Sequence, residues 1–247
     1  MSIITFLSDF GERDWFVSAV KGEILKINSQ AKIIDITHTV EPFNIKQGAF
    51  IIKMVYNNFP KGTVHLAVVD PGVGSKRKPV IVLSDGHYFV GPDNGIFSYI
   101  YNRNSIVYKI IVNKSVSSTF HARDIFGPVA ARISLGAKLN QLGRRISKFI
   151  KFPFPVIKKR RNKIYGEIVY IDHFGNLITN IPINYPLKNF YIEGLPVIQI
   201  KKSYIFARPE EVIGVKGSSG LYEIACFKER ANRRLNIKVG DKVTGWL

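Results

Sequence analysis

Short β-branched runs alternate with segments of helical periodicity over residues 1–150, and this alternation constrains the fold most strongly. Five runs have the length and composition of buried strands, at residues 3–7, 33–36, 64–69, 80–83 and 106–111. Three helices are predicted between them, over 16–27 with Asp14 as the cap, over 44–56, and from Asp124 to Gly136. Strands that alternate with helices predict an α/β class, with an N-terminal layered domain over residues 1–150.

The pattern changes after residue 150. Residues 151–163 contain two prolines and the run Lys158-Lys159-Arg160-Arg161, which predicts a basic linker. From residue 164 onward short strands and turns dominate, at 166–171, 177–181, 197–201 and 212–215. We therefore expect a smaller, all-β, barrel-like C-terminal domain over residues 164–247.

The charge balance is strongly basic, with 36 Lys and Arg against 18 Asp and Glu. Residues 141–165 hold nine basic residues and no acid, which fits either a solvated linker or an anionic partner such as nucleic acid. We favour the linker, because the rest of the excess is scattered, so a nucleic-acid partner is not expected.

No stretch approaches the roughly 20 apolar residues of a membrane span. A single cysteine, Cys226, and a first segment that resembles a strand rather than a signal peptide predict a cytoplasmic protein.

Polar clusters follow several predicted strands of the first domain. In open α/β sheets ligands bind beyond the carboxyl ends of strands, so Asp9, Asp70 and His121 are candidate site residues. The Pro-Gly-Val-Gly turn after Asp70 could return Arg77 to its carboxylate, either as part of a site or as an ion pair that braces two loops. His38 is interpreted as structural. Gly91-Pro92-Asp93-Asn94-Gly95 is interpreted as a turn that caps a following helix.

The second domain has one comparable cluster, in which Asp172, Phe174 and Asn176 fall within five residues. A carboxylate, an aromatic ring and an amide suit a purine and an ammonium group, but they also suit an ordinary β-turn. Residues 217–220, Gly-Ser-Ser-Gly, offer hydroxyls and free amides that can receive a carboxylate.

Five motifs occur together in one order: Ser-Asp-Phe-Gly at 8–11, Val-Val-Asp-Pro-Gly-Val-Gly at 68–74, Gly-Pro-Asp-Asn-Gly at 91–95, Thr-Phe-His-Ala-Arg-Asp at 119–124 and Ile-Asp-His-Phe-Gly-Asn at 171–176. This pattern resembles the S-adenosyl-L-methionine hydroxide adenosyltransferases (S-adenosylmethionine hydrolases), which are relatives of fluorinase and chlorinase. The resemblance covers almost the whole chain. It implies an N-terminal α/β domain and a C-terminal β-barrel in a homotrimer. The substrate would lie between the first domain of one subunit and the second domain of its neighbour, with no cofactor and no metal.

The resemblance also implies roles for individual residues. Asp70, Arg77 and His121 match the set that activates water. The residues that match substrate contacts are Asp9 (ribose hydroxyls), Phe43 (nucleoside packing), Asp14 and Asp172 (methionine end), Phe174 and Asn176 (adenine), Ser218 or Ser219 (methionine carboxylate), and Arg230 and Ala231 (adenine, where loop lengths vary).

One residue departs from the family pattern, since Ala122 stands where the family usually has glycine. The resemblance implies hydrolysis rather than halide transfer, because fluorinase lacks an Asp at the position of Asp70, has Ser at that of Ala122 and carries an inserted loop. Residues 85–94 of this chain contain no such insertion. The alternatives are a halide-dependent adenosyl transferase and a basic nucleic-acid-binding protein that uses Lys158–Arg161.

Overall fold

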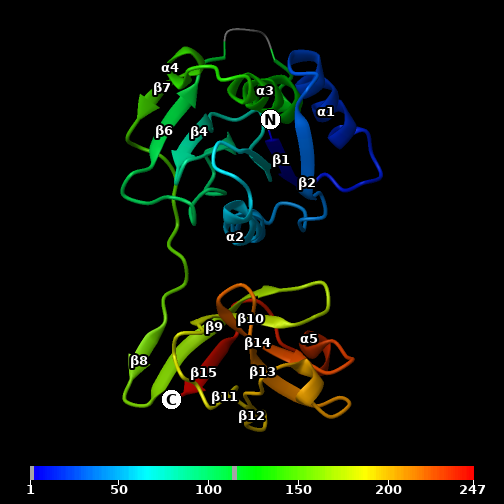
Figure 1. Cartoon of the computed structure of the whole chain (residues 1–247), viewed down its shortest axis with the longest axis vertical. Coiled ribbons are helices and arrows are strands. Elements are labelled where there is room, and N and C mark those ends of the chain that lie inside the picture. The colour runs from blue at the N-terminus through cyan, green and yellow to red at the C-terminus, as the bar shows by residue number, and fades with distance from the viewer. Residues whose placement is uncertain (1–2, 113–115) are drawn as a thin grey trace. The chain divides into compact units, whose positions relative to one another are not determined.

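The computed structural model describes residues 3–112 and 116–247, and the chain divides into two compact units, Met1–Pro153 (unit 1) and Phe154–Leu247 (unit 2) (Figure 1). Unit 1 is a mixed α/β sheet domain and unit 2 an antiparallel, nearly closed β-barrel, so the predicted fold class is confirmed. No helix in the described ranges is both long enough and apolar enough to cross a bilayer.

The described part of unit 1 contains a seven-stranded sheet in the order β2-β1-β3-β5-β4-β6-β7. β2, β1, β3 and β5 are parallel, whereas β4, β6 and β7 add antiparallel pairs. The strands are β1 (Ile3–Ser8), β2 (Lys32–Thr37), β3 (Val64–Val68), β4 (Pro79–Ser84), β5 (His87–Pro92), β6 (Ile106–Ile110) and β7 (Gly143–Ile146). β5 and β7 lie outside the predicted strands, since Gly91, Pro92 and the arginines of β7 are weak strand signals.

The helices of unit 1 are α1 (Phe16–Ile27), α2 (Ile45–Val55), α3 (Gly127–Ser134) and α4 (Leu139–Leu142), with the 3₁₀-helix η1 (Tyr56–Asn58) and the π-helix η2 (Ala122–Phe126). Asn44 caps α2, because its side chain accepts a hydrogen bond from the Gln47 amide. The prediction that Asp14 caps α1 is wrong. The N-cap is Trp15, in a helical conformation and with no side-chain cap bond.

Helices cover both faces of this sheet. Alternate residues of β1 point to opposite sides, so Ile4 and Phe6 pack with α1 and α3, whereas Leu7 packs with Ile52 of α2. Figure 1 shows α2 on the other side of the sheet from α3. The two apolar layers fix the carboxyl ends of β1, β2 and β3 at one edge, where the polar clusters follow.

The described part of unit 2 is an eight-stranded sheet in the order β12-β11-β15-β9-β10-β14-β13, with β8 paired to β9 off this path. An isolated bridge between Ile200 and Gly214 brings the two ends of the path together, which nearly closes the barrel. The elements are β8 (Lys158–Arg160), β9 (Lys163–Ile171), β10 (Leu177–Pro182), β11 (Asn189–Tyr191), β12 (Ile198–Gln199), η3 (Tyr204–Phe206, a 3₁₀-helix), β13 (Val212–Lys216), β14 (Leu221–Cys226), α5 (Ala231–Arg234) and β15 (Lys242–Trp246).

The basic run differs from the prediction of a plain linker over 151–163. Lys158–Arg160 form β8, which pairs with the first residues of β9 through a turn in which Arg161 has a φ of 50°. The strand is exposed along its length. Cationic side chains are typical of edge strands, and the pairing with β9 rather than the composition decides the structure here.

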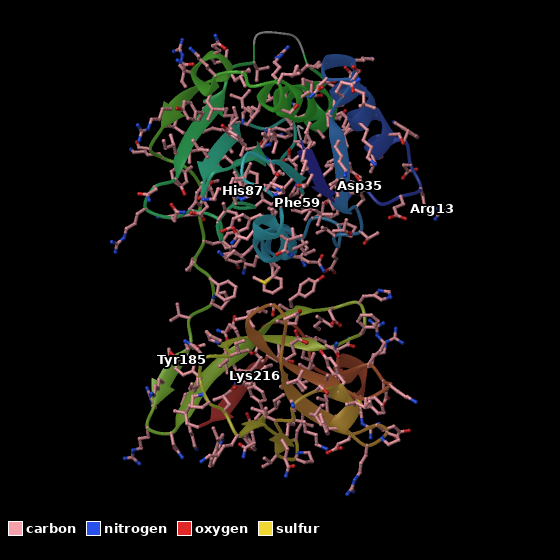
Figure 2. All side chains as sticks on the ribbon, in the orientation of Figure 1. Arg13, Asp35, Phe59, His87, Tyr185 and Lys216 are labelled. Carbon is pink, nitrogen blue, oxygen red and sulfur yellow. The ribbon has the colours of Figure 1, made fainter. Side chains whose placement is uncertain are left out.

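Two buried histidines in unit 1 predict how stability depends on pH. His65 Nδ1 lies 2.8 Å from Thr5 Oγ1, and His65 Nε2 lies 3.2 Å from Nδ1 of His87, which is labelled in Figure 2. Burial, reinforced by His87, lowers the pKa of His65 to about 3. In the unfolded chain His65 binds a proton near pH 6.5, whereas in the folded chain it binds one only at a much lower pH. The contribution of unprotonated His65 to the free energy of unfolding is therefore fully present above that pH. It is lost, at about 1.4 kcal/mol per pH unit, as the pH falls toward 3.

Urea unfolding at pH 7 and pH 4.5 measures this contribution. His65→Gln is expected to lose much less stability between these two pH values than the wild-type chain does. His173→Gln, at an exposed histidine, is the matched control and should follow the wild type. Equal losses in all three proteins would show that the buried pair does not titrate in this way.

Candidate functional site

Three polar side chains of unit 1 meet at the end of β3. Arg77 Nε donates a 2.9 Å hydrogen bond to Asp70 Oδ1, Arg77 Nη2 contacts Asp70 Oδ2, and Nη2 also lies 2.7 Å from His121 Nδ1. The side chains of Asp70 and Arg77 are only 5% and 7% exposed. The turn through Gly72 and Gly74 returns the chain, and a Cβ at Gly74 would lie 2.4 Å from the Ser118 carbonyl oxygen. The loop through Gly74 therefore packs against the loop that contains Ser118. Arg77 lies beside Asp70, as the sequence predicts.

The electrostatics of this cluster define its hydrogen-bonding roles. Burial, followed by the charge of Arg77, lowers the pKa of His121, so its imidazole is neutral near pH 7. Since Arg77 can only donate, His121 Nδ1 accepts and the proton resides on Nε2. Arg77 Nη1 is buried and has no hydrogen-bond partner among the described residues. An unpaired buried guanidinium N–H is costly, because buried donors normally have a hydrogen-bond partner.

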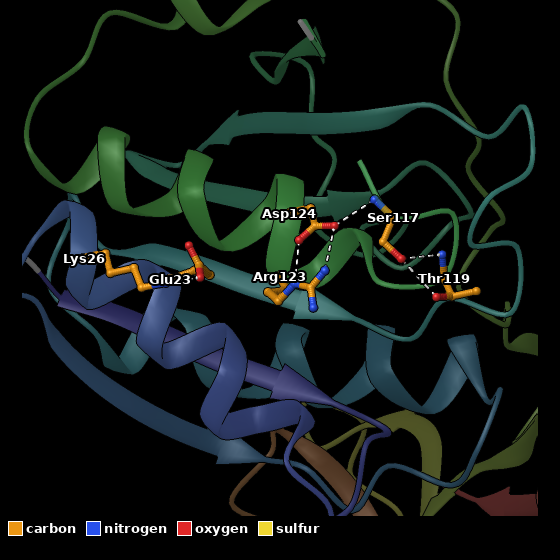
Figure 3. Close-up of polar contacts among 6 residues, drawn as sticks. All are labelled: Glu23, Lys26, Ser117, Thr119, Arg123 and Asp124. Atoms are coloured by element: carbon orange, nitrogen blue, oxygen red, sulfur yellow. Dashed lines mark hydrogen bonds and ion pairs between the residues drawn. The ribbon is translucent and has the colours of Figure 1, made fainter. Parts of the chain in front are cut away.

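The segment that carries His121 is held by an acidic anchor, drawn in Figure 3. Asp124 Oδ1 accepts a 2.6 Å hydrogen bond from Arg123 Nε, and Asp124 Oδ2 accepts a 2.8 Å bond from the Ser117 amide. The hydrogen bond from Arg123 is the main cause that lowers the pKa of Asp124. His121 itself precedes the π-helix η2, and such helical irregularities are frequent at functional sites.

A pocket of about 290 Å³ opens beside this cluster, lined by Asp9, Asp70 and His121 and by aromatic rings. Asp9 Oδ2 accepts a 2.9 Å hydrogen bond from the Phe43 amide, and burial raises the pKa of Asp9. Phe43 has a φ of 70°, a rare conformation for a bulky residue, and is 71% exposed although it lines the pocket. Such strain persists where the surroundings impose it, and the bond to Asp9 is part of that restraint.

Ala122 forms part of the same pocket wall. It is buried, begins η2 and lies next to His121. Its methyl group therefore occupies space that a glycine would leave open in the pocket.

His38 ties together the two loops that carry Asp9 and Phe43. Its Nδ1 lies 2.8 Å from Ser8 Oγ, its Nε2 lies 3.0 Å from Oδ1 of Asp35, which Figure 2 labels, and its carbonyl accepts a 2.7 Å bond from the Gly11 amide. Ser8 and His38 are both buried. These contacts agree with the structural interpretation of His38.

The prediction that residues 91–95 cap a following helix is wrong, because turns rather than a helix follow them. Asp93 Oδ1 accepts a 2.7 Å hydrogen bond from the Ile150 amide, and Asn94 Nδ2 donates a 2.8 Å bond to the Val69 carbonyl. The motif thus joins the end of β3, one residue before Asp70, to the segment that leaves unit 1.

Unit 2 contains a second pocket, of about 630 Å³, and five predicted residues line it: Asp172, Phe174, Asn176, Ser218 and Arg230. Asp172 accepts from the Asn176 amide at 2.8 Å and from Asn176 Nδ2 at 2.9 Å. This arrangement needs the tight turn at Gly175, whose φ is 84° and whose Cβ would lie 2.5 Å from Asn232 Oδ1.

The polar groups near this pocket include three that were not predicted, Glu223, Tyr204 and Asn232, beside the predicted Ser219 and Arg230. Glu223 lines it from β14 and accepts a 2.8 Å hydrogen bond from the Tyr204 hydroxyl, and burial raises the pKa of Glu223. Ser219 Oγ, Arg230 Nε and Asn232 Oδ1 are buried without a hydrogen-bond partner in the described residues. Neither Glu223 nor Tyr204 belongs to a polar motif in the sequence: Glu223 stands alone among apolar residues, and Tyr204 follows the ordinary polar run Lys201-Lys202-Ser203.

Three predicted residues are not pocket-lining. Asp14 is exposed and lies outside the residues that line the unit 1 pocket. Ala231 is buried at the start of α5, and Ser219 is absent from the lining of the unit 2 pocket although Ser218 contributes to it. Residues 3–112 and 116–247 contain no group of three or more His, Cys, Asp or Glu that could hold a metal ion.

Comparisons with known proteins match both units. Family models for the SAM hydroxide adenosyltransferase N-terminal and C-terminal domains match residues 4–143 and 166–244. The (R)-S-adenosyl-L-methionine hydrolase of Methanocaldococcus jannaschii is 35% identical over 98% of this chain and 95% of its own length. The fluorinase of Actinopolyspora mzabensis is 26% identical over 72% of this chain and 71% of its own. An uncharacterized conserved protein from Thermotoga maritima has a TM-score of 0.93 at 32% identity, covering 99% of this chain and all of that one.

Proposed function

The chain belongs to the SAM hydroxide adenosyltransferase family, and we propose that it hydrolyses S-adenosyl-L-methionine to adenosine and L-methionine. The observation that carries the proposal is the hydrogen-bonded Asp70–Arg77–His121 cluster, which borders the unit 1 pocket. The hydrolases among the similar proteins align with nearly the whole of this chain and over nearly their own full length, which supports the proposal.

The proposed reaction is an in-line attack of water on the ribose C5′ carbon. The bond from C5′ to sulfur breaks, the electron pair stays on sulfur, and methionine leaves as a neutral thioether that needs no proton. Water is a very weak acid, so the difficult part is activation of the nucleophile. Asp70 is proposed to take the proton as the new C–O bond forms.

Arg77 and His121 are proposed to position Asp70 and the water. Two contacts from Arg77 fix the carboxylate, while the buried, unpaired Arg77 Nη1 offers one further donor. His121 is neutral and presents Nε2–H as a second donor. Since charge is neutralised as oxygen approaches the sulfonium, a pocket that excludes water favours the transition state.

We propose that residues of both pockets contact the substrate. We assign the ribose to Asp9 and Phe43 in unit 1, and the adenine to Phe174, Asn176 and Arg230 in unit 2. The family resemblance implies the remaining roles. It assigns Asp14 and Asp172 to the methionine ammonium, Ser218 or Ser219 to the methionine carboxylate, and Ala231 to the adenine. Because these contacts divide between two units, we further propose a homotrimer in which unit 1 of one subunit works with unit 2 of the next.

Water is favoured over halide as the nucleophile because the Asp70 carboxylate would repel an anion beside C5′. Chromatography of the products formed with and without chloride tests this choice. We expect adenosine in both reactions, at the same rate. A chloride-dependent product, 5′-chloro-5′-deoxyadenosine, would replace the hydrolase with the halide-dependent alternative.

A further inference from the structure

One face of unit 2 lies outside the proposed site. Residues directly opposite each other on paired strands point to the same side of a sheet. The register of β8, β9 and β15 therefore gathers eight side chains on one face, which we call the β8–β9–β15 face: Lys158, Arg160, Lys163, Tyr165, Glu167, Lys242, Thr244 and Trp246. The residues between them on β9 and β15 are buried, so these eight point away from the core.

The β8–β9–β15 face is cationic. It holds four basic residues and one acid, Glu167, which is paired with Lys242. Lys158 and Arg160 are exposed, and neither forms an ion pair within the described residues. Both contribute, with Tyr165 and Lys242, to a hollow of about 360 Å³. Glu167 lines the same hollow, but its carboxylate is paired with Lys242, so Lys158 and Arg160 remain without an acidic partner there and suit a polyanion.

Two aromatic rings lie among these cations. Tyr165 is 39% exposed and Trp246, at the end of β15, is 38% exposed, so both rings are partly open to solvent on this face. Lys163 Nζ lies 4.5 Å from the centre of the Trp246 ring. Exposed rings on a cationic barrel surface provide stacking platforms for unpaired bases, because every base has a π-face.

We propose that the β8–β9–β15 face binds single-stranded nucleic acid. Lys158 and Arg160 contact the phosphates, and bases stack on Tyr165 and Trp246. A duplex buries its base faces, so it cannot use the two rings. The face is separate from the unit 2 pocket, because it lies at the Lys163 end of β9 whereas Asp172 follows the other end, about 26 Å away at ~3.3 Å per residue.

Fluorescence anisotropy with a labelled oligothymidine of about 20 nucleotides, and with the matching duplex, tests the proposal. The full chain is expected to prefer the single strand and to lose affinity as salt rises. Lys158→Gln with Arg160→Gln should flatten the slope of log affinity against log salt by about 1.4. Lys159→Gln is the matched control, because Lys159 lies opposite buried Ile164 and so points to the other side of β8.

The decisive variants leave the charge unchanged, because a chain of net charge +18 attracts any polyanion. Tyr165→Leu and Trp246→Leu are each expected to weaken single-strand binding by roughly 5- to 150-fold, the value of one stacked base. Circular dichroism confirms folding, and Tyr165→Leu decides alone if Trp246→Leu unfolds. Wild-type affinity in the leucine variants, equal affinity for duplex, or an equal loss in Lys159→Gln would overturn the proposal.

Discussion

Replacing Asp70 is expected to lower adenosine release by about 10²–10⁴-fold, the usual contribution of a positioned base. This corresponds to roughly 3–5 kcal/mol of activation free energy. Asp70→Asn is the better variant than Asp70→Ala, because alanine leaves the buried Arg77 guanidinium without its partner and costs stability as well. Single-turnover kinetics with S-adenosyl-L-methionine, together with a binding isotherm, separate loss of chemistry from loss of binding.

We expect Asp70→Asn to bind the substrate within a fewfold of wild type and to melt at a higher temperature than Asp70→Ala, because Asn keeps an oxygen that can accept a hydrogen bond from Arg77. Glu12→Gln removes an exposed carboxylate outside the pocket and should leave turnover unchanged. Turnover of Asp70→Asn near the wild-type rate would remove Asp70 from the mechanism. Loss of binding with unchanged single-turnover chemistry would make Asp70 a substrate contact instead.

Two inactive variants are expected to restore activity when they assemble together. Asp9→Ala removes a contact in the unit 1 pocket, and Asn176→Ala removes one in the unit 2 pocket. If each site uses unit 1 of one subunit and unit 2 of the next, random co-assembly rebuilds an intact site in about a quarter of positions. Co-expressed variants should therefore recover up to about 25% of wild-type turnover.

Light scattering should find the wild-type chain at three times its 27.9 kDa mass. Mixing the two purified variants without exchange of subunits is the control, and it should stay inactive. No recovery in co-assembled particles of confirmed mixed composition would show that each site is built within one chain. A fully active monomer would contradict the trimer itself.

The sequence predicts much of the first pocket because its residues follow strand ends. Asp9 and Asp70 are placed by the sheet, and the turn through Gly74 makes the return of Arg77 to Asp70 foreseeable. The strain at Phe43 is different, since its φ of 70° depends on a bond to Asp9, 34 residues away. The conformational preferences of the residues around Phe43 cannot indicate a contact with a residue so far away in the sequence.

The wrong predictions were read from composition, whereas the structure at these positions depends on which residues they contact. The motif at 91–95 has the composition of a helix cap, yet Asp93 binds the Ile150 amide, 57 residues later. Lys158–Arg160 have the composition of a linker, and only the pairing with β9 makes them a strand. Glu223 looks like an ordinary exposed strand residue in the sequence, whereas closure of the barrel buries it beside Tyr204.

Hydrolysis in water enriched in oxygen-18 tests the central claim most directly. If water attacks C5′, mass spectrometry will find the heavy oxygen in the 5′-hydroxyl of adenosine and none in methionine. Fragmentation of the nucleoside locates the label on the ribose rather than the base. Adenosine without the isotope, the isotope in the amino-acid product, or no adenosine at all would contradict the proposed reaction.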